Sequence, residues 1–459
     1  MVFTSAIFLF VFLPLTIGIY FISNNHFKNI WLLTVSLLFY SWGEPIHILL
    51  MIFSIIINYI LAILINKCTS ASHILLSRIL LTFTIITDLS LLFYYKYWTF
   101  LLINVNHLFS TQFHVPSIAL PIGISFFTFQ ALSYVVDVYR GNATVQKNPL
   151  NLGLYIALFP QLIAGPIVRY VDIEKQLHDR STSLVQLYDG VKLFMAGFSK
   201  KVLIADQLAP LVDTVFASNG FSAPVAWIGA ISYSLQIFFD FSGYSDMAVG
   251  LGKIFGFEFV NNFNFPYISK TIKEFWHRWH ISLSSWFRDY VYIPLGGSRC
   301  KPLRTYFNLG LVFFLTGLWH GASWNYIVWG LYYAVFLILE RLFGNCLLKK
   351  IPQPLQHFYA LIVILLGWVL FRADNLPNAC MYINNLFTIN NHSFVDLLSI
   401  VNRKHIFCIL VGIIFSIPWT NKSKLKSHFF YDIVIILIFI ISIAYMLGNG
   451  FSPFLYFRF

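Results

Sequence analysis

Charged residues are scarce in this chain of 459 residues, and their scarcity decides its class. Only 10% of the residues are charged, whereas 58% are hydrophobic and the mean hydropathy is +0.73. A soluble domain carries roughly 25% charged residues, so this chain lacks the charge that would solvate a globular surface. The same composition excludes a disordered chain, a collagen and a coiled coil. The sequence therefore predicts an all-α, polytopic integral membrane protein.

Cysteine clusters and nucleotide-binding motifs are also lacking. The five cysteines are scattered without a CxxC pair, which excludes a zinc site or disulfide framework of the usual spacing. No GxSxG elbow, Walker loop or dinucleotide fingerprint occurs, so a covalent serine mechanism has no support in the sequence. We expect no tightly bound cofactor. The net charge of +12 comes with no nucleic-acid-binding motif. We assign it to cytoplasmic loops and anionic lipid headgroups, and expect no nucleic acid partner.

Long apolar runs are what the sequence has instead. A membrane span needs roughly 20 apolar residues, and we expect about eleven membrane-associated helices, the shorter ones re-entrant or tilted. We expect one polytopic domain over 1–459, with segment 270–304 facing the cytoplasm. The first run has no basic region before it, which favours a retained span over a signal peptide. The candidate runs are 5–22, 29–42, 45–65, 74–95, 97–105, 117–136, 150–164, 222–239, 305–339, 355–371, 405–418 and 430–448.

The segment Ser269–Tyr290, SKTIKEFWHRWHISLSSWFRDY, interleaves six formal charges with aromatic residues. Two readings stay open: a segment at membrane depth wrapped by protein, whose ionisable groups are functional candidates, or a cytoplasmic amphipathic helix with an aromatic anchor face. His277 and His280 share a face if the segment is one helix, with Glu274 a turn earlier. No third ligand is spaced to complete a metal site, so we expect none.

The run 305–339 holds 35 residues without a formal charge. As one helix it would extend about 52 Å, far beyond the roughly 30 Å hydrocarbon core. It must therefore break, and Gly317, Gly321 and Ser323 mark the place. His320 lies at that break, where we interpret it as a base lining a cavity rather than a packing residue.

A third polar segment is FDFSGYSDMAVGLGKIFGF, in which Asp240 and Asp246 follow an uncharged run. The residues around Gly243 suggest an interrupted helix. The alternative is helix capping around Gly243, with the acids paired to Lys253 or an arginine. We favour a structural role here over catalysis.

The segments RWHISLSSWFRDYVYIPLGG and GLWHGASWNYIVWG resemble the membrane-bound O-acyltransferase (MBOAT) superfamily, specifically the bacterial branch that contains the alginate O-acetylation membrane protein. LPIGISFFTFQALSYVVDVYRG, QLIAGPI, FDFSGYSDMAVG and the two ends of the chain extend the resemblance from residue 2 to 459. It implies a ring of about eleven tilted helices around a central tunnel. The family's motif histidines match His320 and His280, whereas His277 stands where another basic residue is usual and receives no role.

The resemblance implies transfer of an acyl group from a cytoplasmic thioester to a hydroxyl at the other membrane face. We expect acetyl-CoA as the donor and O-acetylation of a cell-surface polysaccharide, alginate- or peptidoglycan-like. His320 would be the general base, and His280 would orient it, polarise the carbonyl or shuttle the proton. The expected supporting residues are Arg288 and Asp289 beside His280, Asp240, Tyr244 and Asp246 as tunnel or structural residues, and Lys270, Lys273 and Arg278 for the donor's phosphates.

The expected partners are membrane lipids, acetyl-CoA or an acylated carrier, and an extracytoplasmic SGNH-type acetyltransferase, all at a bacterial inner membrane. Three alternatives stay open. One is D-alanyl transfer to teichoic acid from a carrier protein, and another is a transporter with histidine proton relays. The transporter predicts an internal repeat, which the sequence lacks. The third is a non-catalytic scaffold for a secreted acetyltransferase.

Overall fold

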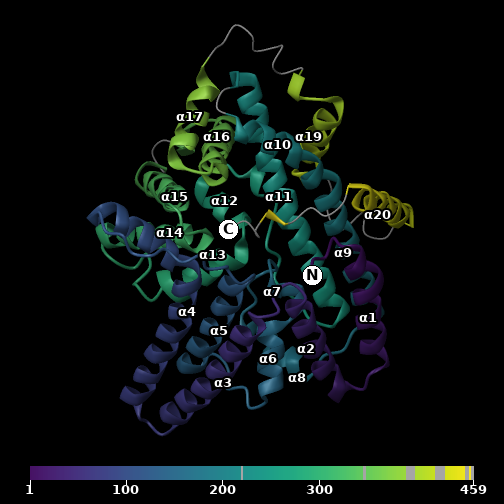
Figure 1. Cartoon of the computed structure of the whole chain (residues 1–459), viewed down its shortest axis with the longest axis vertical. Coiled ribbons are helices and arrows are strands. Elements are labelled where there is room, and N and C mark those ends of the chain that lie inside the picture. The colour runs from purple at the N-terminus through teal and green to yellow at the C-terminus, as the bar shows by residue number, and fades with distance from the viewer. Residues whose placement is uncertain (219–220, 345–347, 389–398, 419–428, 450–453, 456–459) are drawn as a thin grey trace. The chain divides into compact units, whose positions relative to one another are not determined.

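The structure is a computed structural model of the whole chain. It describes every residue except 219–220, 345–347, 389–398, 419–428, 450–453 and 456–459. All regular elements of the described residues are helices (Figure 1), which confirms the all-α prediction. The backbone divides into two compact units, Met1–Phe194 with Ser245–Val260, and Met195–Tyr244 with Asn261–Phe459. That the chain acts as one domain stays a prediction.

In the first unit, helices α3, α4 and α5 pack side by side (Figure 1). The runs 74–95 and 97–105, predicted as separate spans, form the single helix α4. On α3, Asn58 donates to Asp88 Oδ1 of α4 at 2.9 Å, a polar contact between two apolar helices. The helices of this unit are η1 (Phe8–Phe12), α1 (Leu13–Ile22), α2 (Asn25–Ser41), α3 (Ile48–Ser70), α4 (Ile74–Phe109), α5 (Ile124–Arg140), α6 (Pro149–Ala157), α7 (Phe159–Leu162) and α8 (Tyr170–His178).

The second unit holds all but one of the predicted site residues. Two helices, α9 (Leu184–Lys200) and α11 (Ala223–Ile254), run from one unit into the other. The remaining helices are η2 (Lys201–Ala205), α10 (Asp206–Ala217), η3 (Pro266–Ile268), α12 (Ile272–Arg278), α13 (Ile281–Phe287), η4 (Arg288–Tyr292), α14 (Pro302–His320), α15 (Trp324–Phe343), η5 (Leu348–Lys350), α16 (Gln353–Arg372), α17 (Leu376–Phe387), α19 (Arg403–Phe415) and α20 (Phe429–Asn449).

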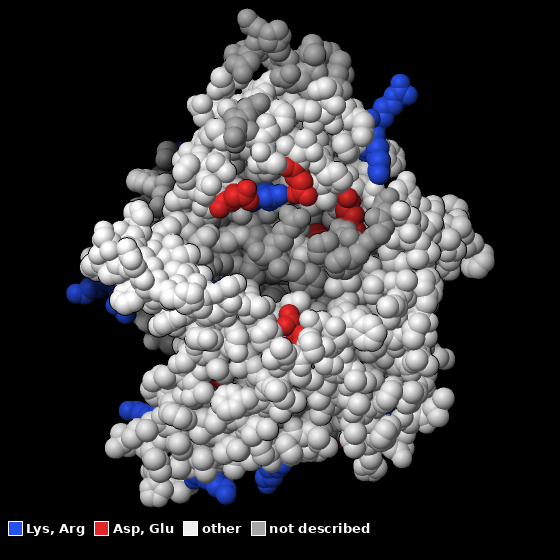
Figure 2. All heavy atoms as spheres, viewed as in Figure 1, with Lys and Arg blue, Asp and Glu red and all other residues white. Residues whose placement is uncertain are grey.

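Five helices of the described residues are long and apolar enough to cross a membrane: α3, α4, α15, α16 and α20. Most of the apolar window of α20 is exposed, as expected for a helix that faces lipid. The face drawn in Figure 2 is likewise mostly uncharged. A multi-pass membrane protein is thereby supported, whereas a ring of about eleven helices around a tunnel stays a prediction.

Helix α11 runs without interruption from Ala223 to Ile254, so the predicted break or cap around Gly243 is wrong. Gly243 is needed for packing instead. A Cβ at this position would lie 2.7 Å from the carbonyl oxygen of Gly197 on α9. Glycine therefore lets these two helices approach closely, which the sequence alone does not reveal.

Candidate active site

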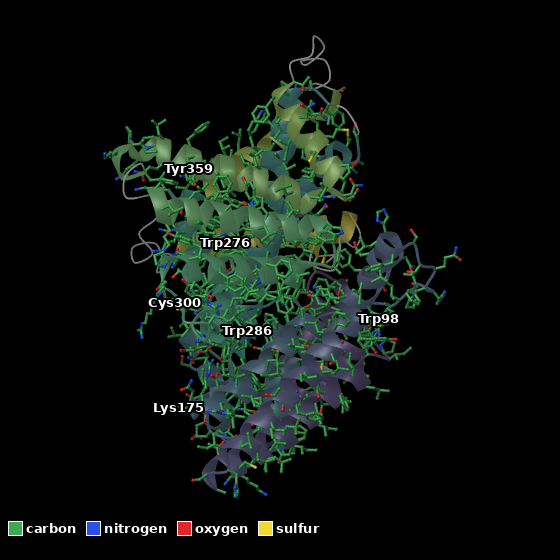
Figure 3. The ribbon with its side chains drawn as sticks, turned by 90° about the vertical axis from the view of Figure 1, so that its left-hand side faces the viewer. Trp98, Lys175, Trp276, Trp286, Cys300 and Tyr359 are labelled. Carbon is green, nitrogen blue, oxygen red and sulfur yellow. The ribbon has the colours of Figure 1, made fainter. Side chains whose placement is uncertain are left out.

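The aromatic residues of Ser269–Tyr290 are buried within the protein. Phe275, Trp276, Trp279, Trp286 and Phe287 are each less than 9% exposed. Figure 3 shows Trp276 and Trp286 inside the molecule among crowded side chains. This burial favours the reading in which protein wraps the segment over the reading in which an aromatic face anchors it to lipid.

The segment is two short helices rather than one. Helix α12 ends at Arg278, and His280 adopts the left-handed conformation (φ 44°, ψ 55°) before α13 begins. The condition under which His277 and His280 would share a helix face, one continuous helix, is therefore not met. His277 is exposed and its Nδ1 contacts the carbonyl oxygen of Lys273 at 2.6 Å, whereas His280 is completely buried.

His280 is held by an amide and by aromatic rings. Its Nδ1 lies 3.1 Å from Asn262 Oδ1. Its ring makes edge contacts with Phe241 of α11, at 4.7 Å between centroids, and with Trp319 of α14, at 5.8 Å. Burial lowers the pKa of His280 to about 3, so the imidazole is neutral near pH 7 and keeps a lone pair on one of its ring nitrogens.

His320 is the last residue of α14, and the chain breaks at 321–323 before α15 begins at Trp324. The predicted break is confirmed. The His320 side chain is 4% exposed, and its ring contacts Trp319, Trp329 and Phe371 at centroid distances of 5.0, 5.0 and 5.2 Å. Trp319 thus contacts both motif histidines.

Two glycines bring α14 and α15 together. A Cβ at Gly317 would lie 2.2 Å from the carbonyl oxygen of Tyr326, and one at Gly330 would lie 2.2 Å from that of Phe313. Gly317 was predicted to mark the break, and this prediction is wrong. The residue lies inside α14, where it allows close contact with α15. This contact fixes the direction in which α14 presents His320.

Glu340 of α15 caps the start of α12. Its carboxylate accepts hydrogen bonds from the backbone N–H groups of Ile272, at 2.5 Å, and Lys273, at 2.9 Å. These groups have no partner within the helix, and the negative charge complements the positive end of the helix dipole. The capped helix leads directly to His280.

The three predicted donor-binding cations lie on or beside α12. Lys270 Nζ donates to Gln353 Oε1 at 2.8 Å, and Lys273 is exposed. Arg278 pairs with Glu274 at 3.0 Å and donates to the carbonyl oxygen of Asn264. The pairing with Glu274 offsets the charge that Arg278 could offer a phosphate.

Arg288 and Asp289 form an ion pair with each other. The Nε to Oδ1 distance is 2.7 Å, and the Arg288 side chain is 60% exposed. The partner that the structure gives His280 Nδ1 is Asn262, which sequence reasoning missed. That Arg288 and Asp289 support His280 stays a prediction.

Asp240 belongs to a buried charge cluster. Lys201 Nζ lies 2.6 Å from both Asp240 Oδ1 and Asp206 Oδ1, and the backbone N–H of Leu455 donates to Asp240 Oδ2 at 2.9 Å. The cation that the structure pairs with Asp240 is Lys201, where Lys253 or an arginine was predicted. These contacts support a structural role for Asp240.

Tyr244 and Asp246, the other residues of this motif, lie on the same helix, α11, but the boundary between the two units falls between them. The buried ring of Tyr244 contacts Phe454 at 4.9 Å. Asp246 falls in the first unit and is half-buried. His280, His320, Asp240 and Tyr244 therefore belong to the second unit, and Asp246 belongs to the first.

Across the described part of the chain, no group of three or more His, Cys, Asp or Glu side chains could hold a metal ion. Asn262, Lys201 and Glu340 were not predicted from the sequence. Each acts on a residue at least 18 positions away, and the only sequence signal was their polarity in an apolar chain.

Comparison with known proteins identifies the family of this chain. Residues 19–383 match the membrane-bound O-acyltransferase family, MBOAT. The probable alginate O-acetylase AlgI of Azotobacter vinelandii is 38% identical over the whole of both chains. The corresponding protein of Pseudomonas aeruginosa is 41% identical over 90% of this chain and 79% of its own. The peptidoglycan O-acetyltransferase of Helicobacter pylori is 36% identical over 86% of this chain and 82% of its own. The chain therefore belongs to the MBOAT family and is an acyltransferase.

Proposed function

We propose that this protein transfers an acetyl group from cytoplasmic acetyl-CoA for the O-acetylation of a cell-surface polysaccharide. The names of its relatives support acetyl transfer to alginate or to peptidoglycan. The observation that carries the proposal is that the two motif histidines contact one ring, Trp319, from two different elements.

His320 acts as the general base. It accepts the proton of the acceptor hydroxyl as that oxygen attacks the thioester carbonyl carbon. The carbon–sulfur bond breaks, and the proton passes from His320 to the departing thiolate, which leaves as a thiol. His280, neutral and buried, orients the reacting carbonyl or relays the proton.

The cations at the start of α12 and at its end attract the donor's phosphates. Lys273 is the strongest candidate because its side chain is exposed, and its ammonium also interacts electrostatically with the carboxylate of Glu340. An extracytoplasmic SGNH-type acetyltransferase completes the transfer at the other membrane face, and the protein lies in a bacterial inner membrane.

The test uses a strain that lacks this gene and is complemented with wild type, His320→Ala, His280→Ala or His277→Ala. Envelope polysaccharide is isolated, its esters are released by mild alkali, and acetate and D-alanine are quantified separately. We expect both site variants to lose acetate and His277→Ala, an exposed histidine, to retain it, at equal amounts of membrane protein.

Other outcomes point to the alternatives. Loss of D-alanine with normal acetate would replace the proposal by transfer to teichoic acid. Normal acetate in His320→Ala would favour a scaffold or a transporter, and an altered proton flux in that variant would favour the transporter.

A further inference from the structure

Asn262 lies in the loop between α11 and α12 and is 2% exposed. Its Oδ1 atom is shared by three groups. The backbone N–H of Ser282 donates to it at 3.2 Å and the Ser282 hydroxyl at 2.9 Å, and His280 Nδ1 lies 3.1 Å away. One amide oxygen therefore joins the start of α13 to the imidazole.

The chemistry of these groups fixes which one carries hydrogen. A backbone N–H can only donate, so the Asn262 atom that faces Ser282 must be the oxygen and not the NH₂ group. An amide oxygen only accepts, so His280 Nδ1 must carry the hydrogen. A neutral imidazole has one N–H, and the lone pair is consequently on Nε2.

We infer that Asn262 is a positioning residue that fixes the tautomer of His280, so that Nε2 is the nitrogen that accepts a proton or a hydrogen bond during acyl transfer. This inference rests on the proposed function, in which His280 assists His320. A neutral histidine without such a partner divides its population between two tautomers, and only one of them presents a lone pair at Nε2.

The aromatic, hydroxyl and amide neighbours of His280 are uncharged, so a hydrogen bond rather than a charge determines which tautomer the ring adopts. The side chains that contact His280 include Phe241 of α11, Ser282 of α13 and Trp319 of α14, and these three do not ionise near neutral pH. Because burial keeps the ring neutral, an electrically neutral amide suffices to orient it. A carboxylate at this position would instead favour the imidazolium.

Asn262 also holds the backbone, since its carbonyl oxygen accepts a hydrogen bond from Ile281 N–H at 2.9 Å. That bond does not involve the Asn262 side chain. Variants of Asn262 therefore alter the side-chain contacts with His280 and Ser282 while the backbone contact remains.

The experiment compares Asn262→Asp, Asn262→Ala and the matched control Asn261→Asp, an exposed neighbour. The full-length protein is purified in detergent, and release of CoA from acetyl-CoA is followed from pH 4.5 to 8.5 with alginate as the hydroxyl acceptor. The thermal unfolding midpoint measures folding. Asn262→Asp keeps every acceptor contact but adds a negative charge, which raises the pKa of His280 by about 1–3 units.

We expect Asn262→Asp to have nearly wild-type kcat at pH 8 and to lose activity as the pH falls through the raised pKa. Asn262→Ala should lose about 10–100-fold in kcat at every pH, with little change in KM. Asn261→Asp should match wild type. An unchanged pH profile for folded Asn262→Asp, or a wild-type kcat for Asn262→Ala, would overturn the inference. If His280→Ala and His320→Ala retain activity, the proposed function fails first, and the role of Asn262 fails with it.

Discussion

The two motif histidines are positioned by different means. His280 lies between two short helices, where Asn262 contacts its Nδ1 and the backbone is left-handed. His320 ends a helix of 19 residues and is surrounded by the rings of Trp319, Trp329 and Phe371. The first site depends on hydrogen-bond chemistry and the second on the packing of α14 against α15. Substitutions that separate these two dependences test the comparison directly.

The largest effect is expected for His320→Ala. Removal of a general base costs about 10²–10⁴-fold in rate, whereas the loss of one imidazole among aromatic rings leaves the helices intact. CoA release by purified protein measures the rate, and thermal unfolding measures folding. A folded variant that keeps more than a tenth of wild-type activity would remove His320 from the reaction.

Packing at the second site is tested by Gly317→Ala. The added methyl group would lie 2.2 Å from the Tyr326 carbonyl oxygen, so α14 and α15 must separate, at a cost of about 1–3 kcal/mol. We expect a lower unfolding midpoint and reduced CoA release. Gly310→Ala is the matched control in the same helix, because nothing lies within 4 Å of its Cβ position. Equal behaviour of the two variants would contradict the role of packing.

A pH effect should belong to His280. Its pKa is about 3 in the folded protein and about 6.5 when unfolded. Between these values the unfolded chain binds a proton that the folded chain does not, so stability falls as the pH falls below about 6.5. We expect the unfolding midpoint of His280→Gln to decline less steeply than that of wild type between pH 7 and 4.5. Parallel curves would show that the folded protein accommodates the charged ring.

The smallest effect is expected for Arg288→Gln. An exposed ion pair such as Arg288–Asp289 contributes about 0–1 kcal/mol. The free energy of unfolding should therefore change by no more than about 1 kcal/mol, and the rate of CoA release should change less than about fivefold. A loss above tenfold would mean that Arg288 supports the reaction through His280, as the motif suggested. Asp289→Asn provides the complementary variant, since it removes the other half of the pair.

Arithmetic on chain length was sufficient to predict the break beside His320, because an uncharged run of that length cannot cross the membrane as one helix. The all-helical class followed from composition in the same way. The aromatic segment was identified by its unusual mixture of charge and rings, but its division at His280 was not. A left-handed residue other than glycine depends on contacts that the local sequence does not contain.

Tertiary partners account for most of the errors. Gly243 looked like a helix breaker until its neighbour on α9 was known, and Gly317 looked like a break where it is a contact between helices. Asp240 was assigned the wrong cation because its partner Lys201 lies 39 positions before it. Contacts between residues that are distant in the sequence produce no periodic pattern from which they could be predicted.

The carboxylate of Glu340 has a mechanical consequence. It lies about 24 Å along α15 from the break next to His320, yet it clamps the first turn of the helix that carries the chain to His280. A sideways shift of α15 would thus move both imidazoles together and leave their relative position unchanged. The contact between Glu340 and the first turn of α12 would therefore keep the site geometry constant when the surrounding lipids move, although it lies far from the reacting atoms.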